Sequence, residues 1–66
     1  MKITVNNEIK NITDDSLSLL LNEILGEKTK GIAVAINNNI VPKSNWQSTL
    51  LKQNDSVLII KATQGG

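Results

Sequence analysis

Apolar and polar residues alternate at the start of the chain, which predicts a strand. The alternation covers residues 2 to 5 and has the period of two typical of a half-buried strand. Asn6 and Asn7 follow, and because Asn tolerates positive φ, they predict a tight hairpin turn. Ile9 and Ile12 mark a second short strand, and their odd spacing predicts a bulge or an early end.

The next apolar residues recur with the period of a helix. Residues 13 to 16, Thr-Asp-Asp-Ser, carry side-chain oxygens that can cap free N–H groups at a helix start. Gly26 fits the position that ends a helix. One apolar stripe at i, i+3, i+4 and i+7, widened by one further residue, is formed by Leu17, Leu20, Leu21, Ile24 and Leu25.

A hairpin is predicted after a polar connection. Residues 32 to 36 alternate between branched apolar residues and alanine, which predicts another strand. The asparagines at 37 to 39 predict a turn. Ile40 and Val41 then form a short return strand, which Pro42 ends.

The last third of the chain is predicted to close the core. Residues 43 to 48 form a loop or a single helical turn around Trp46, the only aromatic residue, which we interpret as a core anchor rather than a ligand-stacking group. Leu50 and Leu51 are expected to fill the core. The final strand runs from residue 56 to about 62 and is apolar on both faces, which favours a central position in the sheet.

This order of elements predicts an α+β fold: a mixed sheet of four to five strands with one main helix packed on one face. Residues 1–62 form the domain and residues 63–66 a C-terminal tail. If Val57 and Ile59 face the helix, the alternate residues form an uncovered apolar patch, and such patches often bind partners. The alternative is a strand buried on both sides. The patch residues are Leu58, Ile60, Ala62, Ala33 and Ala35.

Composition excludes several classes of function. The 66-residue chain has no cysteine and no histidine, so disulfides, thiolate metal sites and histidine general bases are absent. Seven basic residues, all of them lysine, and six acidic residues leave a net charge of +1, which does not indicate binding to nucleic acid or membranes. We expect a cytoplasmic, monomeric protein that is not an enzyme, with no catalytic residue, no metal site and no bound cofactor.

The terminal carboxylate is the main chemical group left. Gly65 and Gly66 end the chain, preceded by Gln64. A tail without Cβ atoms can enter a narrow channel in another protein. The carboxylate is charged at neutral pH and reacts as an acyl donor only after activation, most simply as a mixed anhydride with a nucleotide. The alternative is a frayed terminus with no role.

Several segments together resemble the ThiS family of sulfur carrier proteins of thiamin biosynthesis. The resemblance covers essentially the whole chain. It is most specific from residue 35 onward, in the string Ala-Ile-Asn-Asn-Asn-Ile-Val-Pro at 35 to 42, then Trp46, Leu50, Asp55, the run 57 to 60, and Gly65-Gly66. It implies the ubiquitin-like β-grasp fold.

The resemblance also implies partners and a sulfur-bearing residue. An adenylating enzyme related to ubiquitin activators would use ATP and Mg²⁺ to place AMP on Gly66, and a cysteine desulfurase persulfide would supply the sulfur of a thiocarboxylate. Thiazole synthase would then take that sulfur. The apolar patch would dock both the activator and the synthase, each excluding the other. The residues just before the glycines, Ala62-Thr63-Gln64, lie where the family is variable.

Three other functions remain open. The small subunit of molybdopterin synthase is another β-grasp sulfur carrier with a Gly-Gly end, although it is usually longer. A protein modifier would attach Gly66 to lysines through isopeptide bonds. A plain interaction module would have an inert tail.

Overall fold

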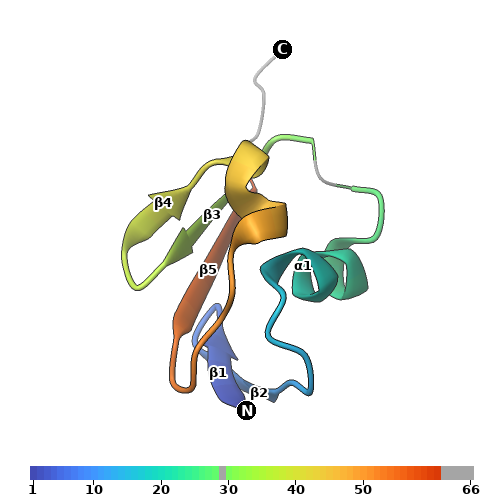
Figure 1. Cartoon of the computed structure of the whole chain (residues 1–66). Helices are drawn as coiled ribbons and strands as arrows, with labels where there is room; N and C mark the ends of the chain where they lie inside the picture. Colours follow the sequence, from blue (N-terminus) through green and yellow to red (C-terminus); the bar gives the residue numbers. More distant parts are fainter. Residues whose placement is uncertain (29, 62–66) are drawn as a thin grey trace.

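Five strands and a helix arranged on one face of their sheet make up the part of the chain that the computed structural model describes, residues 1–28 and 30–61 (Figure 1). Among these residues, no helix has the length and apolar character needed to cross a bilayer. The elements are β1 (Lys2–Val5), β2 (Glu8–Asn11), α1 (Leu17–Leu25), β3 (Ile32–Ile36), β4 (Asn39–Val41), the 3₁₀ helix η1 (Lys43–Ser48) and β5 (Ser56–Lys61).

The sheet is mixed, and β5 lies at its centre. The strand order is β2-β1-β5-β3-β4, so the last strand of the chain is inserted between the two hairpins (Figure 1). β5 runs parallel to β1 and antiparallel to β3, and each hairpin is antiparallel. The prediction of a mixed sheet with a central final strand is confirmed.

Both hairpins turn on pairs of asparagines with positive φ. Asn6 and Asn7 have φ of 51° and 70°, and Asn37 and Asn38 have the same two values. Two successive residues of this kind define the turn that matches the twist of paired strands. β2 ends at Asn11, so the early end predicted from the odd apolar spacing is confirmed.

Helix α1 begins and ends where the sequence predicts. The Oγ atom of Ser16 accepts a hydrogen bond from the backbone N–H of Leu19 at 3.3 Å, which caps the first turn. Gly26 ends the helix with φ of 61°. The predicted apolar stripe is wrong at one position: Ile24 lies at the rim and is 42% exposed, while Leu25 packs against the core. Ile24 lies at the edge of the helix that faces the first hairpin, where it lines a surface hollow with Val5 and Glu8.

The core lies between α1 and the sheet, and η1 closes one end of it. Trp46 is buried, and its Nε1–H donates a hydrogen bond to the Val41 carbonyl at 2.9 Å, which confirms its role as a core anchor. Leu51 is also buried, but Leu50 is 61% exposed, so the prediction that both fill the core is wrong. This segment runs alongside the start of α1 through a bridge between Ser16 and Leu50, so successive side chains point to opposite sides.

Candidate docking face and the exit of the C-terminal tail

The two faces of β5 have different surroundings. Val57 is buried and Ile59 packs against the core, on the side that α1 covers. Leu58 and Ile60 point the other way, and each is 43% exposed. The helix covers one face of the sheet, and within the described residues no element covers these two side chains. The prediction of uncovered apolar side chains on this face is therefore confirmed for Leu58 and Ile60, and the alternative of a strand buried on both sides is wrong.

Strand register places the two alanines of β3 on the same face as this pair. Ala33 lies opposite Ile60, and Ala35 lies opposite Leu58. Ala33 is half-buried, but Ala35 is only 5% exposed, so the expectation that it adds accessible surface is wrong. Ala35 has Leu58 on one neighbouring strand and Ile40 on the other, and these longer side chains flank its single methyl group.

Two isoleucines that sequence reasoning did not assign to this face belong to it. Ile40 of β4 lies opposite Ala35 and is 65% exposed. Ile9 of β2 lies opposite Thr4, on the same face of the sheet, and is 68% exposed. A two-residue turn at 37 and 38 makes Ile40 the cross-strand partner of Ala35. The length of this turn could therefore have placed Ile40 on the outer side of the sheet from sequence. We call the set the outer face: Ile9, Ala33, Ala35, Ile40, Leu58 and Ile60.

The outer face carries little charge. Among the described strand residues, the register places Lys2 as the one charged side chain on this side of the sheet, with Thr4, Asn11 and Ser56 as its polar neighbours. Glu8, the one acidic strand residue in the described part, lies opposite Val5 on the helix side. Covering the outer face with another protein would therefore desolvate few charges, which favours an apolar partner surface.

The outer face and the exit of the tail share one strand. β5 ends at Lys61, which is paired with Ile32 of β3. The other predicted site residues, Ala62, Gln64, Gly65 and Gly66, lie outside the described residues. In sequence, the segment that leads to the terminal carboxylate thus follows directly on the central strand, whose last residue comes one after Ile60 of the outer face.

Two acidic side chains, those of Asp14 and Asp55, serve local structure. Asp14 Oδ1 accepts a hydrogen bond from the Ser16 N–H at 2.9 Å at the start of α1. Asp55 is buried, and its two carboxylate oxygens accept from Asn37 Nδ2 at 2.9 Å and from the Lys52 N–H at 2.8 Å. Within residues 1–28 and 30–61, no cluster of three or more His, Cys, Asp or Glu side chains could hold a metal ion.

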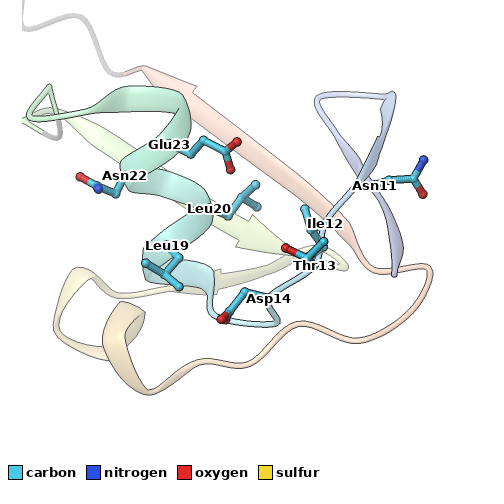
Figure 2. Close-up of a pocket in the computed structure, with 8 residues that line it drawn as sticks. All are labelled: Asn11, Ile12, Thr13, Asp14, Leu19, Leu20, Asn22 and Glu23. Carbon is cyan, nitrogen blue, oxygen red and sulfur yellow. The ribbon is translucent and has the colours of Figure 1, made fainter.

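A hollow between α1 and the segment that enters it is the second surface feature. Figure 2 shows that the amides of Asn11 and Asn22 point in opposite directions there, so these two polar side chains do not converge. Convergent polar groups are what fix a ligand in a pocket, and we assign no function to this hollow. It is lined by Asn11, Ile12, Thr13, Asp14, Leu19, Leu20, Asn22 and Glu23.

Comparisons with known proteins agree with this fold. The sulfur carrier protein ThiS of Escherichia coli (strain K12) is 34% identical over 44 residues, which cover 67% of this chain and 67% of that protein. A crystal structure of the thiamine biosynthesis protein (ThiS) from Geobacter metallireducens has a TM-score of 0.84, with 20% identity and complete coverage of both chains. An NMR solution structure of a thiamine biosynthesis protein from Geobacter metallireducens has a TM-score of 0.76, with 20% identity over 100% of this chain and 88% of that one.

These structures confirm the ubiquitin-like β-grasp fold. The sequence profile of the ThiS family matches residues 3–66, which is nearly the whole chain. The chain therefore belongs to the ThiS family, and it is a sulfur carrier protein of thiamine biosynthesis rather than a catalyst.

Proposed function

We propose that the carboxylate of Gly66 carries the sulfur and delivers it for thiazole formation. A carboxylate oxygen of Gly66 attacks the α-phosphate of ATP in an adenylating enzyme that uses Mg²⁺, and pyrophosphate leaves. The terminal sulfur of a cysteine desulfurase persulfide then attacks the acyl carbon, and AMP leaves. The product is an acyl disulfide between Gly66 and the desulfurase cysteine. A second thiol, acting as the reductant, attacks the cysteine sulfur of this S–S bond and forms a new disulfide with it. Gly66 is released as a thiocarboxylate. Thiazole synthase takes the sulfur from it.

The observation that carries this proposal is the continuity between the outer face and the tail. Leu58 and Ile60 present an uncovered apolar surface on the central strand, and the same strand leads directly into the tail. A partner that docks on this surface holds the end of β5, where the tail begins, close to its own active site. The absence of cysteine fits the same scheme, because the backbone carboxylate can hold sulfur without a side-chain thiol.

We propose that the adenylating enzyme and thiazole synthase both dock on the outer face. Ile40 extends this face beyond Leu58, Ile60 and Ala33. Ala35 is buried between the longer side chains of Ile40 and Leu58. Because both partners would cover the same residues, they would bind one at a time. The proposed setting is the cytoplasm, with the free chain a monomer.

Intact mass measurement tests the proposal. The chain is incubated with the adenylating enzyme, ATP, Mg²⁺, cysteine desulfurase and cysteine. We expect a single mass increase that corresponds to the exchange of one oxygen for sulfur, and no increase in a matched variant that lacks Gly66. An unchanged mass of the full chain under conditions where a known sulfur carrier is loaded would overturn the proposal.

Two further outcomes separate the alternatives. A ladder of higher masses with proteins of a cell extract indicates a protein modifier. Loaded chain that supports molybdopterin synthesis with a molybdopterin synthase large subunit, but not thiazole formation with thiazole synthase, indicates the other sulfur-carrier pathway.

A further inference from the structure

Two asparagines of like geometry hold β5 from its two edges. Asn6 and Asn37 are each the first of the two positive-φ residues in their hairpin turns. The backbone N–H of Asn6 donates to the Val57 carbonyl at 2.9 Å, and that of Asn37 donates to the Ser56 carbonyl at 2.8 Å. Their side chains accept in return: Asn6 Oδ1 from the Ile59 N–H at 2.8 Å, and Asn37 Oδ1 from the Ser56 N–H at 2.9 Å.

The Asn6 contact lies where the neighbouring strand has ended. β1 pairs with β5 only as far as Val5 opposite Val57, whereas β3 continues to pair with β5 as far as Lys61. Beyond Val57, the edge of β5 that faces β1 therefore has no strand beside it in the described structure. The side chain of Asn6 satisfies the Ile59 N–H on this edge and so extends the hydrogen bonding of β1 by one position.

The half of β5 that this contact holds is the half that the proposed function uses. It includes Leu58 and Ile60 of the outer face, and it leads into residues 62–66. β3 supports it along one edge, and Asn6 supports the other. If this strand is already ordered before the partner docks, binding does not lose the conformational entropy of ordering it, and the carrier binds more tightly.

We propose that Asn6 is a positioning residue for sulfur loading: through the Ile59 N–H it keeps the end of β5 in strand conformation before the adenylating partner docks. This inference rests on the proposed function. Asn37 has a different task, because its Nδ2 also donates to the buried carboxylate of Asp55 and so fixes the turn before β5. Loss of the Asn6 acceptor therefore acts on docking, and loss of Asn37 acts on folding.

The test compares variants of one turn. Asn6→Gly keeps the positive φ and removes the acceptor oxygen, since glycine adopts this conformation freely. Asn7→Gly is the matched control, because it makes the same backbone change in the same turn, and within the described residues the Asn7 side chain makes no hydrogen bond. Asn6→Asp restores an acceptor oxygen at the same place and is the rescue variant.

Two measurements are made on each full-length variant. Amide hydrogen exchange by NMR follows Ile59 at a residue level, and urea unfolding gives the global stability. Steady-state adenylation of Gly66 by the adenylating enzyme, followed by pyrophosphate release, gives KM and kcat for the carrier as substrate.

We expect Asn6→Gly to raise the exchange rate of Ile59 and the KM about 5-fold relative to Asn7→Gly, the factor of one ordinary hydrogen bond, with kcat unchanged. Asn6→Asp should return both quantities to near the wild-type values. A merely structural role would lower global stability and leave KM equal in the two glycine variants, and that result would overturn the inference. Equal Ile59 exchange in the two glycine variants would also overturn it.

A different result would contradict the proposed function without contradicting the role of Asn6 in holding β5. If the wild-type chain is not adenylated while Ile59 exchange still distinguishes Asn6→Gly from Asn7→Gly, then the contact that holds β5 stands and the sulfur-carrying role of Gly66 falls.

Discussion

Replacing Leu58 by aspartate should separate docking from folding. In the folded chain this side chain is 43% exposed, so an introduced carboxylate can remain hydrated. A fully buried leucine contributes about 1.5–3 kcal/mol, and the part of Leu58 that is buried accounts for about half of that. We therefore expect the free energy of unfolding to fall by only about 1 kcal/mol.

Docking should suffer more from the same substitution. A partner that covers the outer face would bury the rest of the side chain, which is worth about 1 kcal/mol for leucine. It would also desolvate the new carboxylate, for which the described strands offer only Lys2 as a charge on this face, at a cost of several kcal/mol. A loss of about 3 kcal/mol corresponds to a Kd that is about 100-fold weaker.

Leu50→Asp provides the matched control. Leu50 is 61% exposed and lies beside the start of α1, away from the outer face, so the same chemical change is made at another exposed leucine. Calorimetric titration with the adenylating enzyme gives the Kd of each variant. Urea unfolding followed by the fluorescence of Trp46, the only aromatic residue, gives their stabilities.

The reasoning is refuted by either of two results. If Leu58→Asp lowers stability as much as it weakens docking, the side chain is part of the core and not of an interface. If Leu50→Asp weakens docking as much as Leu58→Asp does, the partner does not distinguish the outer face from the rest of the surface.

Three other substitutions have distinct expected effects. Ile40→Asp should weaken docking to a similar degree with little change in urea stability, because Ile40 is 65% exposed on the outer face; an unchanged Kd would limit the interface to β3 and β5. Gly66→Ala should leave the urea midpoint unchanged and reduce thiocarboxylate yield, read by intact mass, because a Cβ narrows the angles open to the reacting end; a normal yield contradicts this. Leu20→Ala should lower the free energy of unfolding by about 2–5 kcal/mol, because this side chain is buried beneath α1, and a loss below 1 kcal/mol would be inconsistent with that burial.

The parts of the fold that depend on neighbouring residues could be predicted from sequence. Ser16 caps the helix that follows it, and Gly26 ends that helix through its own φ of 61°. Asn6 and Asn37 begin turns because their own backbones accept positive φ. The alternation along β5 likewise assigned Val57 and Leu58 to opposite faces, since strand geometry alone determines that parity.

The features that sequence reasoning missed depend on what lies across the sheet. Ala35 is buried because longer side chains on two other strands flank it, and no pattern within β3 records their lengths. Leu50 is exposed and Leu51 buried because the segment lies extended against the start of α1. The contact from Asn6 to Ile59 exists because β1 ends before β5 does, and only the packed sheet sets that difference in length.

By itself, then, the sequence determined which residues could be strands, turns, helix caps and apolar faces, because each of these follows from the period and backbone preference of a short segment. The tertiary structure decided which apolar face stays uncovered and which side chains flank it. That choice depends on contacts between segments far apart in the chain, where one helix packs on one side of the sheet and, in the described residues, leaves Leu58, Ile60 and Ile40 open on the other.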